Sequence, residues 1–94
     1  MQWLRKAKGP KYTQVKTFEE VKRLADRDGG ADFVISLNFG LRASYHLAWD
    51  GERMYVLSMV DDSERELTPE QFMDPGETNF KEAMSKGALY HEQF

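Results

Sequence analysis

The stretch LRASYHLAWDGERMYVLSMV, residues 41–60, decides the fold because it holds two alternating runs joined by an Asp-Gly pair. In the first run, apolar or aromatic residues occupy every second position up to Trp49, which is typical of a half-buried β-strand. Asp50-Gly51 favours a two-residue type I′ turn, since both central residues of that turn need positive φ. The sequence therefore predicts a β-hairpin in which Trp49 lies opposite Glu52.

The two faces of this hairpin differ in character. One face is almost entirely apolar and is expected to face the core. The other face carries Tyr55, Leu57 and Met59 on its second strand, bordered by Arg53. Aromatic residues, methionine and arginine are enriched in the centres of protein interfaces. This second face is therefore either covered by the C-terminal segment or open to a partner.

A helix is predicted over residues 18–28, before the hairpin. Thr17 is a good N-cap residue and Glu20 completes a capping box three positions later. Gly29-Gly30 then supplies the left-handed conformation that commonly ends a helix.

The remaining elements follow from alternation and from helix-start signals. Residues 31–39 alternate like a strand, residues 12–16 fit a short edge strand, and residues 65–67 fit another short strand. Residues 68–71 and 79–87 carry helix-start patterns. The order predicts an α+β fold with one N-terminal helix, a three- to four-stranded antiparallel β-meander and one or two short C-terminal helices.

The chain is expected to be one domain behind a basic arm. Gly9-Pro10 interrupts any helix near the start, so residues 1–11 are predicted to be a flexible arm and residues 12–94 a single α+β domain. Residues 88–94 fit a strand, an extension of the preceding helix or a tail.

Charge is distributed unevenly along the 94 residues. Residues 1–16 carry five basic and no acidic residues, whereas the rest carry eight basic and sixteen acidic residues. An acidic body argues against a nucleic-acid-binding body, although the basic arm could contact nucleic acid or an anionic membrane.

Other compositional features exclude several classes of site. The chain has no cysteine, which excludes disulfides, zinc–thiolate sites and cysteine nucleophiles and favours the cytoplasm. No apolar run approaches the roughly 18 to 20 residues of a membrane span, so no membrane partner is expected.

Four carboxylates, Asp61, Asp62, Glu64 and Glu66, follow the hairpin within six positions. A calcium loop of the EF-hand type needs glycine at its sixth position, where a loop starting at Asp61 has Glu66. A catalytic carboxylate pair needs two groups facing each other across a pocket, and these are neighbours on a polar turn. Two interpretations of these carboxylates remain. They belong to a solvated turn and protect a strand edge against unwanted pairing, or they form an acidic row that imitates phosphates and contacts a partner.

Nucleophilic catalysis has little support in the sequence. Ser44 and His46 lie two positions apart on one strand face, about 6.5 to 7 Å between their Cβ atoms, which is too far for an unaided hydrogen bond. No nucleophile-elbow motif is present, and His91 falls in the predicted tail. We expect neither enzymatic activity nor a cofactor.

Two stretches of the C-terminal third, DDSERELTPEQF and NFKEAMSKGALY, carry a resemblance. The matching residues are Asp61, Asp62, Ser63, Glu64, Glu66, Leu67 and Thr68, followed by Lys86, Gly87, Ala88, Leu89 and Tyr90. At these residues the chain resembles small uncharacterised proteins encoded by phages and mobile elements of Gram-positive bacteria. The resemblance implies no catalytic residues, and it implies a context in which small acidic proteins bind and inhibit a host or defence protein.

These observations favour a small non-enzymatic cytoplasmic binding module that acts by protein–protein contact, as a phage-type inhibitor with an acidic surface. A homodimer through the same surface is the other protein partner to consider. The alternative is a nucleic-acid-associated accessory protein that uses the basic arm. The candidate partner-binding residues are Asp61, Asp62, Glu64, Glu66, Arg53, Tyr55, Leu57 and Met59.

Overall fold

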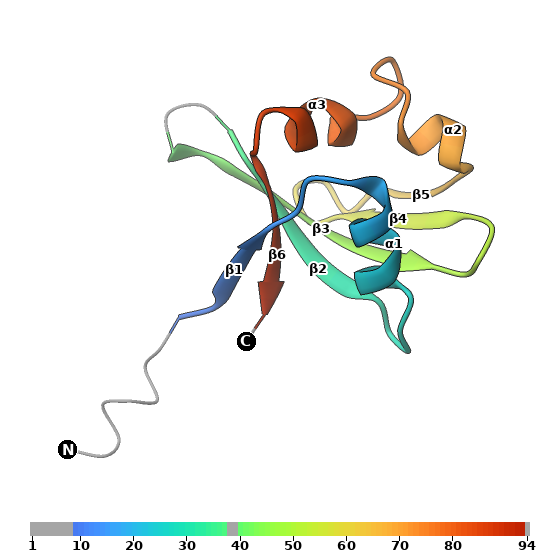
Figure 1. Cartoon of the computed structure of the whole chain (residues 1–94), viewed down its shortest axis with the longest axis horizontal. Coiled ribbons are helices and arrows are strands. Elements are labelled where there is room, and N and C mark those ends of the chain that lie inside the picture. Colours follow the sequence, from blue (N-terminus) through green and yellow to red (C-terminus); the bar gives the residue numbers. More distant parts are fainter. Residues whose placement is uncertain (1–8, 38–39, 94) are drawn as a thin grey trace.

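The computed structural model describes residues 9–37 and 40–93, and within these ranges it contains six strands and three short helices (Figure 1). In chain order the elements are β1 (Lys11–Gln14), α1 (Phe18–Ala25), β2 (Ala31–Ser36), β3 (Arg42–Trp49), β4 (Met54–Ser58), β5 (Glu64–Leu67), α2 (Pro69–Phe72), α3 (Phe80–Ser85) and β6 (Leu89–Gln93). Of the predicted arm, residues 1–8 lie outside the described residues, and Lys11 already belongs to β1.

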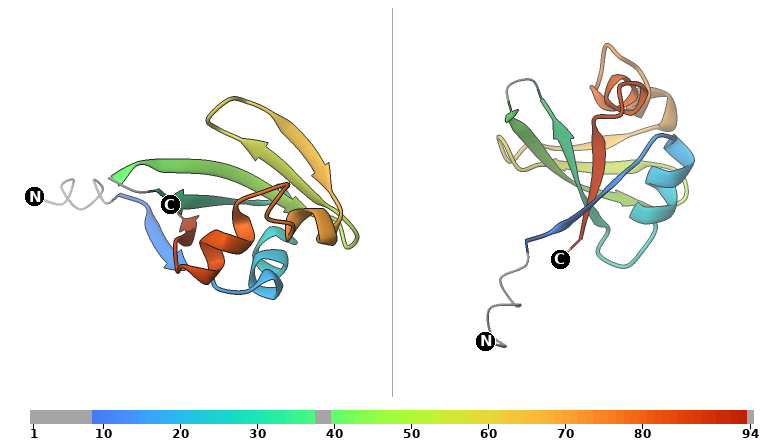
Figure 2. Two further views of the ribbon diagram at one scale, coloured as in Figure 1. Left: turned by 90° about the horizontal axis from the view of Figure 1, so that it is seen from above. Right: turned by 60° about the vertical axis from the view of Figure 1, so that its left-hand side comes forward.

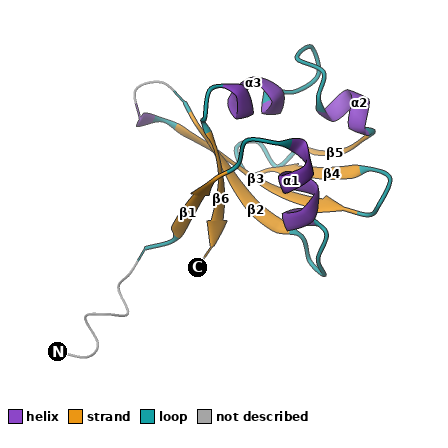
Figure 3. Ribbon diagram, in the orientation of Figure 1, coloured by secondary structure: helices purple, strands orange, loops and turns teal. Residues whose placement is uncertain are grey.

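The six strands form one sheet in the order β1-β6-β2-β3-β4-β5, with every neighbouring pair antiparallel. The prediction of one N-terminal helix, a three- to four-stranded meander and one or two C-terminal helices is therefore wrong, because strands dominate this fold (Figure 3). The β2–β5 meander is present, but β6 joins it to β1. Tyr12 pairs with Glu92, a residue 80 positions away, and local patterns do not encode such a contact.

The predicted helix starts at Thr17 and at residues 68–71 are confirmed. The Thr17 side chain accepts a hydrogen bond from the Glu20 amide at 3.1 Å, and Thr68 caps α2 with Pro69 in its first turn. Helix α1 ends at Ala25, three residues before its predicted end, and the two glycines lie in the loop that follows.

The aromatic side chains of the three helices pack together on one face of the sheet. Phe72 of α2 stacks on Phe18 of α1 at 5.2 Å and on Phe80 of α3 at 4.5 Å between ring centroids. Phe80 also meets the ring of Tyr45 on β3 at 5.0 Å. Figure 2 shows all three helices on the same side of the curved sheet. This side is the core, and no helix of residues 9–37 and 40–93 covers the opposite face.

The β3–β4 hairpin exists with a register two residues away from the predicted one. Trp49 pairs with Met54, so the connection spans residues 50–53 instead of Asp50-Gly51 alone. The Asp50 carboxylate accepts hydrogen bonds from the amides of Glu52 and Arg53 at 2.8 and 2.7 Å, which stabilises the longer loop. Because side chains alternate with a period of two, a two-residue shift keeps the same residues on the core face.

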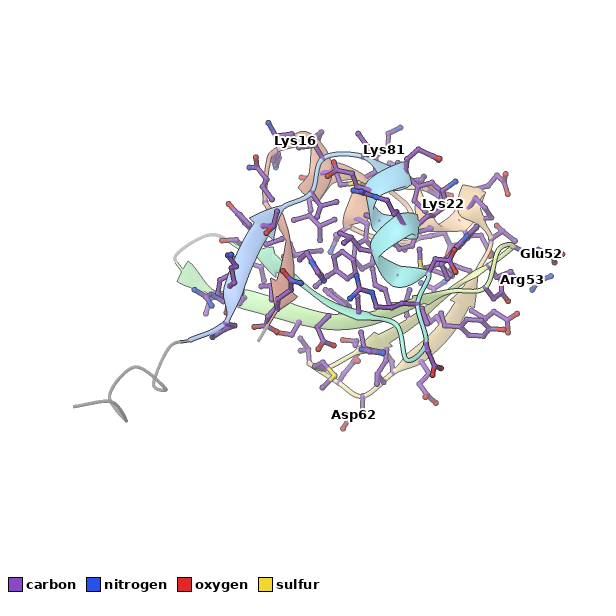
Figure 4. All side chains as sticks on the ribbon, turned by 60° about the horizontal axis from the view of Figure 1, so that its bottom comes forward. Lys16, Lys22, Glu52, Arg53, Asp62 and Lys81 are labelled. Carbon is purple, nitrogen blue, oxygen red and sulfur yellow. The ribbon has the colours of Figure 1, made fainter. Side chains whose placement is uncertain are left out.

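The uncovered face of the sheet, called here the open face, carries Tyr55 and Leu57, and of the two predicted alternatives it is the open one. Tyr55 is 42 % exposed and Leu57 is half-buried, since the C-terminal helices lie on the other side of the sheet. In Figure 4, Lys16, Lys22 and Lys81 lie on the helical side, and Asp62 projects from the opposite side.

Candidate functional site

The open face has a shallow hollow of about 420 Å³ between strands β3, β4 and β5. Its lining mixes charged and polar residues with apolar ones. We call it the open-face hollow, and its lining residues are His46, Ala48, Tyr55, Val56, Leu57, Glu64, Arg65 and Glu66.

Half of the predicted partner-binding residues line this hollow. Strand pairing places Tyr55 opposite Glu66 and Leu57 opposite Glu64, so two residues from the predicted strand face meet two from the predicted acidic row. Arg53 lies at the border, where its guanidinium approaches the Glu66 carboxylate at 3.5 Å. Both groups are about half exposed, so this pair contributes little to stability.

The other three predicted residues lie in the β4–β5 turn, outside the hollow. The Asp61 carboxylate accepts a hydrogen bond from the Ser63 amide at 3.0 Å, and its hydrogen bonds with the side chain and the backbone of Ser63 lower the Asp61 pKa. Asp62 adopts a left-handed conformation with φ of 58°. Both aspartates therefore shape the turn. Met59 is 58 % exposed beside them.

Tyr55 stands next to negative charge. The Glu66 carboxylate, followed by partial desolvation, raises the pKa of the Tyr55 hydroxyl. A raised pKa keeps this hydroxyl protonated at neutral pH, and the hydroxyl remains a hydrogen-bond donor at the rim of the hollow.

His46 lines the hollow, although it was not among the candidate partner-binding residues. Its Nδ1 lies 2.6 Å from a carboxylate oxygen of Asp32 on β2, and its Nε2 contacts the carbonyl oxygen of Gly29. With both ring nitrogens engaged, His46 fixes the α1–β2 loop against the sheet and presents no ring nitrogen to Ser44. Asp32 and His46 are both visible in the sequence as polar residues of predicted strands, but only the β2–β3 register shows that they lie opposite each other.

The far end of the open face has a different composition. There Arg42 donates to the Tyr12 hydroxyl at 2.9 Å, and that hydroxyl donates to Glu92 at 3.0 Å. The Arg42 guanidinium also lies 5.0 Å from the centre of the Tyr12 ring. This end therefore combines a carboxylate with a guanidinium and a phenol, and Glu92 pairs across the strands with a further carboxylate, Asp32.

His91 was placed in a tail by the sequence, and this was wrong. It belongs to β6, is only 4 % exposed, and packs against Phe33 at 5.4 Å between ring centroids. Burial is the main cause of a lowered His91 pKa; the Arg27 charge adds to the lowering, and the Asp32 charge partly opposes it.

The free energy of unfolding is expected to fall as the pH drops below about 6.5, the ordinary histidine value. Unfolded chains take up a proton on His91 near that pH, whereas the native state does so only at lower pH, so protons favour unfolding. Urea unfolding at pH 7.5, 6.5 and 5.5 measures the loss, and His91→Leu is expected to reduce it. An equal loss in the variant would contradict this role for His91.

Two classes of site have no candidate in the described residues. No group of three or more histidine, aspartate or glutamate side chains within residues 9–37 and 40–93 is placed to hold a metal ion. Among the same residues, no helix has the length and apolar character needed to cross a membrane.

Comparisons with protein-family models, with curated proteins and with solved structures found no match for this chain.

Proposed function

We propose that the chain is a small, non-enzymatic cytoplasmic binding module that holds a basic segment of a partner protein in the open-face hollow. The observation that carries this proposal is the meeting of Tyr55, Leu57, Glu64 and Glu66 in one hollow on the uncovered face of the sheet. Inhibition of a host or defence protein, which the resemblance to phage proteins implies, is the biological outcome included in the proposal.

The chemistry of the hollow suits a lysine or arginine side chain. Leu57 and Ala48 offer apolar surface for the aliphatic stem, and the Glu64 and Glu66 carboxylates can receive its charged end. The Tyr55 ring adds a face for a cation. The engaged ring nitrogens of His46 support a binding role over a catalytic one.

Charge reversal at Glu64 tests the proposal. Glu64→Lys is expected to weaken binding of a lysine-rich heptapeptide about tenfold, because it replaces attraction by repulsion in the hollow. Glu70→Lys is the matched control, since it makes the same charge change at an exposed position on α2. Isothermal titration calorimetry at 50 and 150 mM salt measures both variants, and the native affinity is expected to fall with salt.

Equal affinities for the two variants would contradict the proposal. Recovery of nucleic acid instead of peptide, lost on deleting residues 1–8, would favour the accessory-protein alternative. A two-fold mass in size-exclusion light scattering that Glu64→Lys abolishes would identify a second copy of this chain as the occupant.

A further inference from the structure

The ladder between β4 and β5 shows which backbone groups of β5 point outward. The Ser58 amide donates to the Ser63 carbonyl at 2.9 Å, and bonded pairs alternate with non-bonded pairs in an antiparallel ladder. The amide and carbonyl groups of Arg65 therefore face β4. Those of Glu64 and Glu66 point away from β4.

Strand β5 is an edge of the sheet, since within the described ranges it pairs with β4 alone. Its outward backbone groups can form hydrogen bonds with one more strand, as in β-strand addition. The side chains of the same two residues, Glu64 and Glu66, lie on the open face and line the hollow. A strand added beside β5 would therefore meet both the backbone groups and the carboxylates of these two residues.

A strand added beside β5 would place every second side chain on the open face, directly opposite these carboxylates. Opposite charges at such cross-strand positions stabilise pairing, and like charges oppose it. On the helical side, Arg65 is already paired with the Glu77 carboxylate at 2.6 Å. On the open face, the Arg53 guanidinium lies 3.5 Å from Glu66 and offsets part of its charge, but two carboxylates against one guanidinium still leave this edge acidic, which favours a basic strand.

The opposite edge of the sheet lacks this selectivity. The Val15 amide donates to the Leu89 carbonyl at 2.9 Å, so Tyr12 and Gln14 are the residues of β1 with outward backbone groups. Their side chains are uncharged, and Arg42 lies against Tyr12. Of the two edges of the described sheet, β5 is the one whose outward backbone groups belong to residues with carboxylate side chains.

We propose that the β5 edge binds an extended segment of a partner protein by strand addition, and that this segment carries lysine or arginine at alternate positions opposite Glu64 and Glu66. This inference rests on the proposed function and adds the geometry of binding and the sequence pattern of the ligand. Carboxylates on an edge strand disfavour pairing with neutral or acidic strands, but they can form ion pairs with a strand that carries lysine or arginine.

The test uses a capped heptapeptide that alternates lysine with threonine, and a second peptide identical except for N-methylation of its central backbone amides. Hydrogen exchange followed by NMR is expected to show about tenfold slower exchange of the Glu64 and Glu66 amides on adding the first peptide. The Arg65 amide is the internal control, because it already donates to β4. The N-methylated peptide is expected to bind about tenfold more weakly.

Glu66→Pro, compared with Glu66→Ala, provides a second line of evidence, since both variants lose the carboxylate and only the proline also removes the outward amide without breaking the ladder to β4. Glu66→Pro is expected to weaken binding of the lysine peptide about tenfold relative to Glu66→Ala, and circular dichroism checks that the variant is folded. If both peptides bind equally and exchange at Glu64 and Glu66 is unchanged, strand addition is wrong while the proposed function stands. If neither peptide binds, strand addition and the proposed function are both wrong, and the carboxylates serve only to prevent unwanted strand pairing at the β5 edge.

Discussion

Phe72→Ala is expected to lower the free energy of unfolding by about 4 kcal/mol, the typical cost of removing a fully buried phenylalanine ring. Phe72 has no exposed surface and stacks on the rings of Phe18 and Phe80. It is therefore the side chain through which all three helices are joined. Urea unfolding followed by circular dichroism measures the loss.

The effect of Phe72→Ala is a large fraction of the 5 to 15 kcal/mol that stabilises a typical domain, so Phe72→Leu serves as a milder variant with an expected loss of about 1.5 kcal/mol. Met59→Ala is the control at an exposed apolar side chain and is expected to change stability by less than about 0.5 kcal/mol. A Phe72→Ala loss no greater than that of Met59→Ala would show that the aromatic stack does not hold the helices.

Gly30→Ala is expected to destabilise the fold by about 3 kcal/mol, through a left-handed backbone and a steric overlap. Gly30 has φ of 74°, and a Cβ there would overlap the carbonyl oxygen of Leu47 and lie 2.9 Å from His46 Nε2. The neighbouring backbone of β3 cannot move without disturbing the sheet, so the cost exceeds that of conformation alone.

Gly29→Ala separates the two contributions. Gly29 has φ of 85°, but a Cβ there meets no atom within 4 Å, so only the conformational cost of about 1 kcal/mol is expected. Thermal and urea unfolding of both variants give the comparison. Equal losses would show that the β3 contact at Gly30 is unimportant.

The sequence predicted elements well where the signal was local. The Thr17 and Thr68 caps mark true helix starts, and the alternation of residues 41–60 assigned each strand residue to its correct face. The hairpin register was missed because the Asp50 side chain satisfies two loop amides itself and so stabilises a connection longer than two residues.

Contacts between distant segments could not be predicted in this way. The last strand, β6, carries residues that equally fit a helix extension or a tail, and its place between β1 and β2 depends on pairing across most of the chain. His91 was misjudged for the same reason, since its burial against Phe33 follows from that pairing.

The candidate site combined local and non-local information. Tyr55, Leu57, Glu64 and Glu66 were recognised as two separate groups by their residue types, and only the β4–β5 pairing showed that they line one hollow. Asp61 and Asp62 had the same acidic character, yet the turn uses them for its own geometry. Charge alone does not distinguish these two uses.

The position of β6 between β1 and β2 also governs the order in which the sheet can assemble. On the ribosome, β1 emerges before the other strands of the described sheet, but it cannot pair until residues 89–93 have been made, because β6 is its partner in that sheet. The β2–β5 meander can form from local pairings before then. Closing the sheet requires a loop of nearly the whole chain, which slows folding and leaves the β2 edge uncovered during synthesis.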